Sequence, residues 1–275
     1  MSLLFSESGL RRLDEIVQQR LLCAFDFDGT LAPIVAQPEH ARLPDDIRQH
    51  LIVLSGYVPI AIITGRSIED TYSRLGFDPD FIVGNHGLEG VPGWEAQAQH
   101  HQAICVAWRM QLARMLPPDG DAGIRLEDKR YSLSVHYRGA NDTNDAAVRL
   151  MKLFGALEPQ PRVVAGKYVF NLLPQDAAHK GDALEQLIAI CGARHALYVG
   201  DDVTDEDVFR LQRGDVLSVR IEHAAQSAAQ FFLPRPEDIV QLLTELIRCL
   251  RAAGSVNWLQ TEAADRLTQP QDEHA

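Results

Sequence analysis

Four short polar motifs along the 275-residue chain hold the residues best suited to chemistry. The first, Asp26-Phe27-Asp28-Gly29-Thr30, directly follows the apolar run 21–25. In an extended chain, residues two apart point to the same side, so the carboxylates of Asp26 and Asp28 face one space. Like charges this close are costly unless a cation or a shared proton lies between them. An Asp-Gly turn is the alternative interpretation, and the buried strand predicted before the pair weakens it.

The second motif, Thr64-Gly65-Arg66-Ser67, follows the apolar run 58–63 and begins a predicted helix. Thr64 is placed to hold a phosphate oxygen beside the free N–H groups of the helix N-terminus. Ser67 and Asp70 equally fit a capping box, which needs no ligand.

The third and fourth motifs bring a cation and more carboxylates. Lys180-Gly181-Asp182 places a lysine in the first turn of a predicted helix, where the helix macrodipole disfavours a cation. Gly200-Asp201-Asp202 follows another apolar run, and carboxylate oxygens around such a loop suit Mg²⁺. Asp205 and Glu206 fit equally well as ordinary first-turn helix residues.

The elements that must position these motifs alternate between strand and helix. We predict strands over 21–25, 58–63, 81–83, 196–199 and 216–221, and helices over 10–17, 44–55, 68–75, from 180, from 205 and over 237–250. This alternation is typical of βαβ units, so the fold class is α/β with a Rossmann-like parallel sheet. Such sheets bind ligands beyond the carboxyl ends of their strands, which is where the four motifs lie.

The pattern changes between residues 94 and 174. We predict helices over 97–116 and 142–157 and strands over 123–127, 131–138, 162–165 and 168–173. Residues 132–137 alternate polar and apolar side chains, which is typical of an antiparallel sheet with one open face. The domain prediction is therefore a discontinuous core (1–93 and 175–253), an inserted α+β cap (94–174) and a polar tail (254–275) that we expect to be poorly ordered.

The composition excludes several classes of protein. Twenty-six basic and 38 acidic residues give a net charge of −12, which repels nucleic-acid backbones. No apolar run reaches the roughly 20 residues of a membrane helix, and the start of the chain lacks the features of a secretory signal. The four cysteines are scattered in apolar segments, so we expect reduced core thiols and a cytoplasmic location.

The four motifs, taken in order, resemble those of the haloacid dehalogenase-like phosphatase superfamily. Only the long gap between Thr64 and Lys180 has room for a cap of several strands and helices, as in the branch with an α/β cap. Within that branch the chain resembles trehalose-6-phosphate phosphatases in its core motifs and in its cap. The segments that carry this likeness are Gly84-Asn85-His86-Gly87-Leu88-Glu89, Glu127-Asp128-Lys129, Val135-His136-Tyr137-Arg138 and Gly166-Lys167-Tyr168-Val169.

This resemblance implies Mg²⁺-dependent hydrolysis of trehalose 6-phosphate to trehalose and phosphate through an aspartyl-phosphate. It makes Asp26 the nucleophile and Asp28 the acid and base, while Thr64 and Lys180 hold phosphoryl oxygens. Mg²⁺ would be held by Asp26, the backbone carbonyl of Asp28 and Asp201, with Asp202 or Asp205 nearby. The implied substrate-binding residues are Arg66, Asn85, His86, Glu127, Lys129, His136, Arg138, Lys167 and Asn171.

One departure from the family bears on specificity. The family commonly carries a glutamate, expected to touch the disaccharide, where this chain has Asn171, so the departure concerns the sugar and not the phosphatase chemistry. The alternatives are a phosphatase for another sugar phosphate, such as sucrose 6-phosphate or mannosyl-3-phosphoglycerate, and a sugar-phosphate-binding protein without turnover. The polar cap residues could also form a solvated outer face. The only partner expected is the small substrate, and a monomer is plausible.

Overall fold

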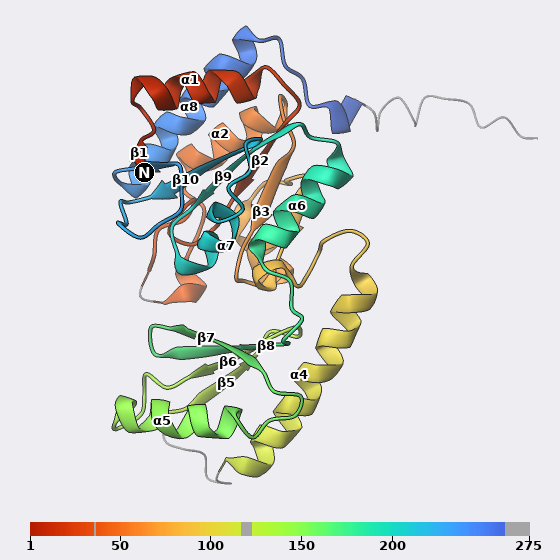
Figure 1. Ribbon diagram of the computed structural model, residues 1–275, viewed down its shortest axis with the longest axis vertical. Coiled ribbons are helices and arrows are strands. Elements are labelled where there is room, and N and C mark those ends of the chain that lie inside the picture. Colours follow the sequence, from red (N-terminus) through yellow and green to blue (C-terminus); the bar gives the residue numbers. More distant parts are fainter. Residues whose placement is uncertain (36, 117–122, 262–275) are drawn as a thin grey trace, which may run out of the picture.

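The computed structural model describes residues 1–35, 37–116 and 123–261. Figure 1 shows two bodies, a large one that carries both ends of the described chain and a smaller one formed by the middle of the sequence. Each body is built on its own β-sheet. Of the predicted tail (254–275), the structure describes residues 254–261, where Trp258 is buried and donates to the Cys191 carbonyl at 2.9 Å. The rest of the tail lies outside the described residues.

The sheet of the large body has seven strands in the order β1-β11-β10-β9-β2-β3-β4, and all neighbours are parallel. The strands are β1 (Ser2–Leu3), β2 (Leu21–Phe25), β3 (Ile60–Ile63), β4 (Phe81–Val83), β9 (His195–Gly200), β10 (Val216–Ile221) and β11 (Phe231–Leu233). Every residue of β2 is buried, as expected for a central parallel strand covered on both faces. The predicted α/β class is confirmed.

Helices cover both faces of this sheet. They are α1 (Glu7–Val17), α2 (Asp45–Ser55), α3 (Ile68–Leu75), α6 (Lys180–Cys191), α7 (Glu206–Phe209) and α8 (Ile239–Ala252), with short 3-10 turns η1 (Pro38–His40), η2 (Asn85–Gly87), η3 (Val203–Asp205) and η4 (Pro236–Asp238). Leu21, Cys23 and Phe25 of β2 pack with residues of α1, α2 and α8, whereas Leu22 and Ala24 pack with residues of α6 and α7. The alternation of side chains along one strand thus separates two apolar layers.

The small body is an antiparallel sheet in the order β5-β6-β8-β7, backed by two helices. Its elements are α4 (Glu95–Met115), β5 (Arg125–Asp128), β6 (Leu133–His136), α5 (Thr143–Phe154), β7 (Arg162–Gly166) and β8 (Val169–Leu173). Leu133 and Phe170 pack with Trp108 of α4 and Phe154 of α5. The opposite face of the sheet is turned toward the large body, where Leu173 packs with Leu88.

The structure differs from the sequence predictions mainly at the edges of elements. The strand predicted over 131–138 is shorter because residues 129–132 form a turn, in which the Lys129 N–H donates to the Ser132 carbonyl at 3.0 Å. The helix predicted from Asp205 is a single turn. Two short strands, β1 at the edge of the sheet and β11 beside it, were not predicted, since two or three residues carry no periodicity.

Other general features agree with the sequence. The four cysteines are buried and free. None of the helices that the structure describes is long and apolar enough to cross a membrane. The boundaries at 93/94 and 174/175 stay predictions, although the residues between them build the separate second sheet.

Candidate active site

The four polar motifs meet at one edge of the large sheet. Asp26 follows β2, Thr64 follows β3 and Asp201 follows β9, and these three strands are neighbours in the sheet. Lys180 is the first residue of α6, which packs on the same sheet. Because the strands are parallel, their carboxyl ends lie side by side and bring the motifs together.

Lys180 lies at the centre of the site. Its Nζ donates to Asp26 Oδ1 at 2.7 Å and to Asp205 Oδ1 at 2.8 Å, and the side chain is only 2% exposed. Burial by itself would lower the pKa of Lys180, but the charges of Asp205 and Asp26 outweigh burial and raise this pKa. A buried lysine between two carboxylates stays charged, because their negative charges compensate its positive charge. Removing either carboxylate would leave an uncompensated charge in the interior.

Asp205 organises the loop that carries Asp201. Its Oδ1 also accepts from the Tyr198 hydroxyl at 2.6 Å, and its Oδ2 accepts from the backbone N–H groups of Asp201 and Asp202 at 2.9 Å each. Burial would raise the pKa of Asp205, but Lys180 and these donors lower it overall. Asp205 is therefore an ionised group that fixes the backbone of the loop that carries Asp201.

Three carboxylates form a candidate cation site. One oxygen from each of Asp26, Asp201 and Asp205 lies within 4.8 Å of the others. Burial raises the pKa of Asp201 to about 7, and Asp205 and Asp202 add to the effect. Burial also raises the pKa of Asp26, with Lys180 opposing the change. A crowded set of oxygen donors whose ionisation is costly fits a hard divalent cation such as Mg²⁺.

The predicted ligand Asp202 is placed differently. Its side chain is exposed and lies outside this group of carboxylates, whereas Asp205, named as the other possibility, is inside it. Both oxygens of Asp205 already accept hydrogen bonds from protein groups. Asp205 would therefore act on a bound cation mainly through its negative charge and not as a direct ligand.

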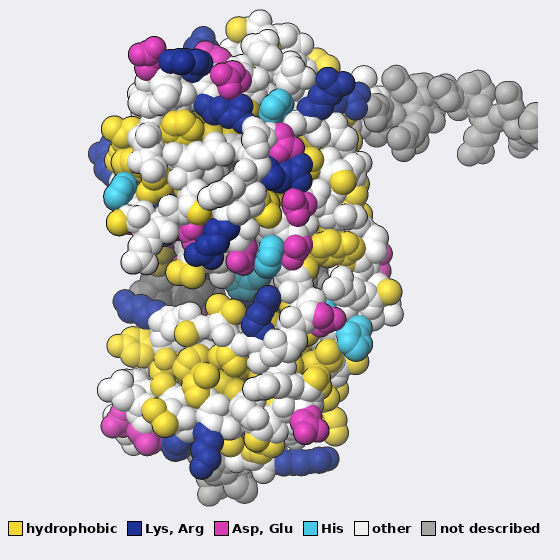
Figure 2. Space-filling model, viewed as in Figure 1, with side chains coloured by type: hydrophobic (Ala, Val, Ile, Leu, Met, Phe, Trp, Pro, Cys, Tyr) yellow, Lys and Arg dark blue, Asp and Glu magenta, His cyan; other side chains and the backbone are white. Residues whose placement is uncertain are grey.

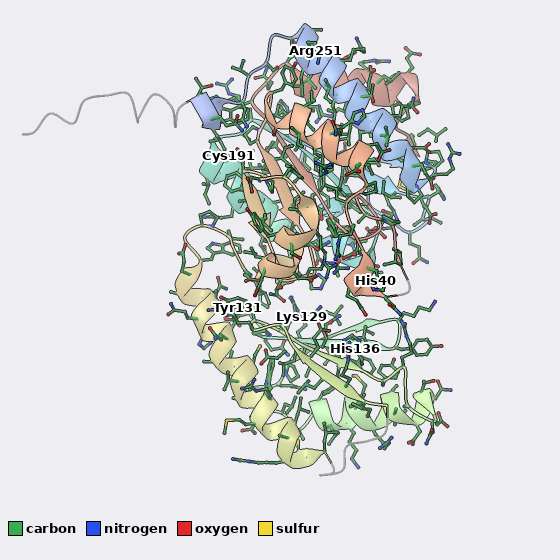
Figure 3. All side chains as sticks on the ribbon, turned by 180° about the vertical axis from the view of Figure 1, so that it is seen from behind. His40, Lys129, Tyr131, His136, Cys191 and Arg251 are labelled. Atoms are coloured by element: carbon green, nitrogen blue, oxygen red, sulfur yellow. The ribbon has the colours of Figure 1, made fainter. Side chains whose placement is uncertain are left out.

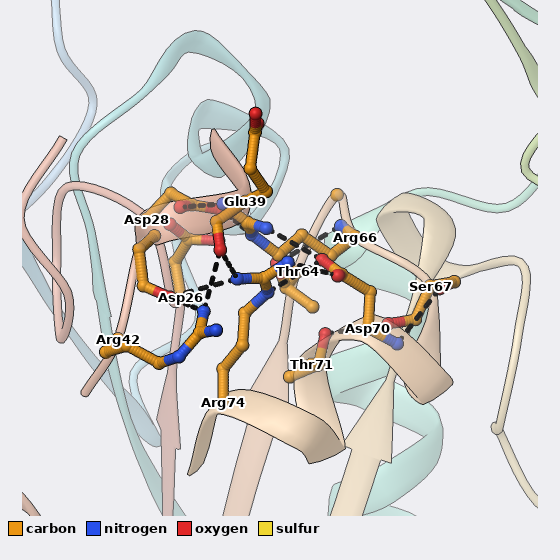
Figure 4. A network of polar contacts seen from close by, with 12 residues as sticks. Asp26, Asp28, Glu39, Arg42, Thr64, Arg66, Ser67, Asp70, Thr71 and Arg74 are labelled. Carbon is orange, nitrogen blue, oxygen red and sulfur yellow. Dashed lines mark hydrogen bonds and ion pairs between the residues drawn. The ribbon is translucent and has the colours of Figure 1, made fainter. Parts of the chain in front are cut away.

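Asp28 is held by an arginine network (Figure 4). Arg66 donates to its two carboxylate oxygens at 2.6 and 2.7 Å and to Asp70 at 2.7 Å, and Arg74 also binds Asp70. Ser67 accepts from the Asp70 backbone N–H at 3.2 Å and so caps α3 as predicted. The Asp70 side chain serves the two arginines instead of closing a capping box. Thr64, 1% exposed, lies beside this network.

The turn η2 is hydrogen-bonded to the loop that begins at Thr64. The backbone N–H groups of Asn85 and His86 donate to the carbonyls of Arg66 and Thr64 at 2.7 and 2.9 Å. Both turn residues have positive φ, 51° and 60°. The ring of His86 packs directly on Gly65, where a Cβ atom would lie 2.3 Å from Cε1. Burial lowers the pKa of His86 to about 3, and Lys180 and Lys129 act in the same direction, so the ring is neutral.

The cap presents polar side chains toward this site. His136 Nε2 lies 2.7 Å from Glu127 Oε2, and the Ser134 hydroxyl donates to Asn171 Oδ1 at 2.6 Å. The Lys129 ammonium reaches the carbonyl of Gly65 in the core, at 3.5 Å. Figure 3 shows Lys129 and His136 on the side of the cap sheet that faces the large body.

The remaining predicted cap residues lie farther out. Arg138 and Lys167 are both exposed, and the Arg138 guanidinium lies 6.0 Å from the centre of the Tyr168 ring. In Figure 2, lysine, arginine and histidine side chains lie along the border between the two bodies together with acidic ones.

Comparisons with known proteins decide the family. The trehalose-phosphatase family model matches residues 24–237, which include the core motifs and the whole cap. The chain belongs to the trehalose-phosphatase family. The resemblance predicted from the motifs is confirmed.

Several curated relatives of this trehalose-phosphatase family member cover most of the chain. It is 31% identical over 263 residues to a trehalose-phosphate phosphatase of Mycobacterium bovis, covering 87% of this chain and 64% of that protein. A probable trehalose-phosphate phosphatase of Oryza sativa is 26% identical over 90% of this chain and 72% of its own length. An uncharacterized glycosyl hydrolase of Mycobacterium tuberculosis is 34% identical over 90% of this chain, but the chain spans only 19% of that protein.

Solved structures of the family share the fold. Trehalose-6-phosphate phosphatase of Aspergillus fumigatus superimposes with a TM-score of 0.62 at 26% identity, over 87% of this chain and 97% of the other. The C-terminal domain of the Candida albicans enzyme gives a TM-score of 0.65 at 24% identity, over 87% and 96%. The predicted phosphatase core with an inserted cap is thus confirmed as a fold.

Sequence reasoning missed three residues that shape the site of this family member. Tyr198 supports Asp205, Arg74 supports Arg66 through Asp70, and Ser134 orients the Asn171 amide. Tyr198 had a usable signal, since its hydroxyl lies in the buried part of a strand and needs a partner. Arg74 and Ser134 gave none, because their partners are chosen by the packing of separate elements.

Proposed function

We propose that this chain hydrolyses trehalose 6-phosphate to trehalose and inorganic phosphate, using Mg²⁺ and an aspartyl-phosphate intermediate. One observation carries the proposal: the buried pair of Asp26 and Lys180 lies beside Asp201 at the sheet edge of a trehalose-phosphatase family member. A carboxylate held in this way is a suitable covalent nucleophile for a phosphate ester.

The metal assignment rests on the donor set. Asp26, Asp201 and the backbone carbonyl of Asp28 would hold Mg²⁺, and Asp205 would add negative charge nearby. Bound there, the ion would reduce the repulsion between the phosphate dianion and the carboxylates. The raised pKa values of Asp26 and Asp201 support this assignment, because a divalent cation offsets the burial and the repulsion between carboxylates that cause them.

Asp26 attacks phosphorus with the oxygen that Lys180 leaves available. Lys180 binds Oδ1, so the carboxylate is oriented and its second oxygen can form the new P–O bond as the sugar oxygen departs. The same ammonium offsets negative charge on the phosphoryl group, and the Thr64 hydroxyl holds one of its oxygens. Water then attacks the aspartyl-phosphate and restores Asp26.

Asp28 delivers a proton to the leaving sugar oxygen and later accepts one from water. In this structure Arg66 binds both carboxylate oxygens of Asp28, so that ion pair must open before the proton can be transferred. A substrate phosphate would compete with Asp28 for the Arg66 guanidinium, because both are oxyanions that bind it in a bidentate manner.

The cap recognises the sugar. Glu127 and His136 form one hydrogen-bonded pair on the face toward the core, and Ser134 and Asn171 form another. Sugar hydroxyls both donate and accept, and a buried hydroxyl without a partner is costly, so such pairs discriminate between sugars. We also propose that residues 94–174 form the cap and that the sugar phosphate is the only partner. The four buried, free thiols support a cytoplasmic location, where thiols stay reduced.

The test is phosphate release with Mg²⁺ from trehalose 6-phosphate, sucrose 6-phosphate, mannosyl-3-phosphoglycerate and glucose 6-phosphate. We expect trehalose 6-phosphate to give the highest kcat/KM. Asp26→Asn should abolish multiple turnover, since its amide is a poor nucleophile, while circular dichroism shows the fold retained. Equal rates across the panel would contradict a dedicated trehalose enzyme. Release from no substrate, with binding of one of them by calorimetry, would favour a binding protein.

A further inference from the structure

Asn85 is fully buried at the border between the two bodies. Its Nδ2 donates to Glu89 Oε2 at 2.9 Å and to the backbone carbonyl of Lys129 at 3.2 Å. Its Oδ1 accepts from the Ser132 hydroxyl at 3.1 Å. A carboxylate and a carbonyl can only accept, so these partners determine which end of the amide is the NH₂ group. Both amide hydrogens and the oxygen are thus used by protein groups.

These bonds join the cap to the phosphate-binding loop. Lys129 and Ser132 are the ends of the turn between β5 and β6. On the other side, Glu89 also accepts from the backbone N–H of Ile68 at 3.1 Å, and the Asn85 backbone donates to the Arg66 carbonyl. The Asn85 side chain therefore connects the cap turn to the segment that follows Thr64.

This connection positions Lys129. Its ammonium lies 3.5 Å from the Gly65 carbonyl, within the field of Arg66 and Asp28. Its backbone carbonyl accepts from both the Asn85 amide and the Tyr131 N–H, so the base of the side chain is held at the same point. A long, flexible lysine binds an anion well only if its backbone is held at the right distance.

We infer that Asn85 is a positioning residue, which ties the turn 129–132 to the core and so holds Lys129 over the phosphate-binding loop. This role rests on the proposed function and replaces direct contact of Asn85 with the substrate. The positive φ of Asn85 fits the role, because asparagine adopts the left-handed conformation at low cost while its amide spans the border.

The first test measures opening of the turn and needs no activity. Lys129 and Arg130 are trypsin sites within the turn, and Arg130 is exposed. Asn85→Gly keeps the left-handed backbone but removes the amide, so we expect native-state cleavage at these sites to accelerate about 10-fold. The matched control is Asn257→Gly, which removes a buried amide bonded to the Ser55 carbonyl, far from the cap, and should leave this cleavage rate unchanged. Equal cleavage of wild type and Asn85→Gly would overturn the inference.

The second test is a double-mutant cycle on trehalose 6-phosphate. Asn85→Gly and Lys129→Ala should each lower kcat/KM about 10-fold, with the same division between kcat and KM. The double variant should be no less active than Lys129→Ala, within about twofold, because Asn85 acts through Lys129. Multiplied losses would mean that Asn85 acts on the substrate itself and would overturn the inference. If wild type hydrolyses no sugar phosphate, the proposed function fails, and the trypsin experiment still decides the role of Asn85.

Discussion

At the scale of single residues, the site depends on polar groups that are buried with their partners. Lys180 is as buried as the apolar core, yet it stays charged because two carboxylates lie within hydrogen-bonding distance. His86 differs from Lys180 in its ionisation state. It has no acidic hydrogen-bond partner among the described residues, so the buried ring stays neutral. Each ionisation state follows from the nearest charges and from the loss of water.

The pKa of His86 predicts how stability depends on pH. A histidine in the unfolded chain titrates near 6.5, and His86 in the folded protein titrates near 3. As the pH falls below 6.5 the unfolded chain takes up a proton that the folded protein does not, so stability is lost. We expect wild type to lose about 2 kcal/mol more than His86→Asn between pH 6.5 and 4.5.

Urea unfolding at both pH values measures this difference. Asparagine is the suitable replacement because it tolerates the positive φ of this position. Equal losses in the two proteins would show that His86 does not titrate as its surroundings indicate.

At the scale of elements, the local sequence pattern predicts most helices and strands. Small residues then decide how closely two elements can pack against each other. α1 is amphipathic, with Leu13, Ile16 and Val17 buried, and it begins at the capping residue Ser6. Gly9 lies on its buried side, where a Cβ atom would be 2.0 Å from the Leu4 carbonyl oxygen. The glycine therefore lets the helix lie against the chain that leaves the edge strand β1.

This contact predicts an unusual sign for a helix substitution. An alanine in place of glycine normally stabilises a helix by about 0.5–1 kcal/mol. Gly9→Ala should instead destabilise the protein by about 1–3 kcal/mol, because the opposing atom belongs to the backbone and cannot rotate away. Ser8→Ala, at the neighbouring exposed position, should change stability by less than about 0.5 kcal/mol. A Gly9→Ala variant that unfolds at the wild-type urea concentration or above would contradict the packing argument.

At the scale of the whole molecule, chemistry becomes possible only when distant parts of the chain meet. Asp26 and Lys180 are 154 positions apart, and Asp201 comes from a third element. The parallel sheet aligns the ends of their strands, and the cap closes over that edge from the same side. The candidate active site is therefore as dependent on global folding as the core is.

This dependence predicts stabilisation by Mg²⁺. A ligand that binds only the folded state at 100 times its Kd adds about 2.7 kcal/mol of stability, which should raise the wild-type Tm by about 5 °C relative to EDTA. Asp201→Asn should lose this shift, and in EDTA it should be at least as stable as wild type because one crowded charge is gone. Asp202→Asn should keep the shift, since Asp202 lies outside the carboxylate group. Calorimetry measures all three, and an unchanged shift in Asp201→Asn would contradict the metal site.

The sequence by itself determined the four motifs, the βαβ alternation, the inserted cap and the family resemblance. These features are local, because strand and helix periodicity and the residues after a strand depend on near neighbours in the chain. The tertiary structure decided which polar groups pair: Arg66 with Asp28, Asp205 with Lys180, and the Asn85 amide with the turn of the cap. Such pairs depend on distances between separate elements, which only the packed fold sets.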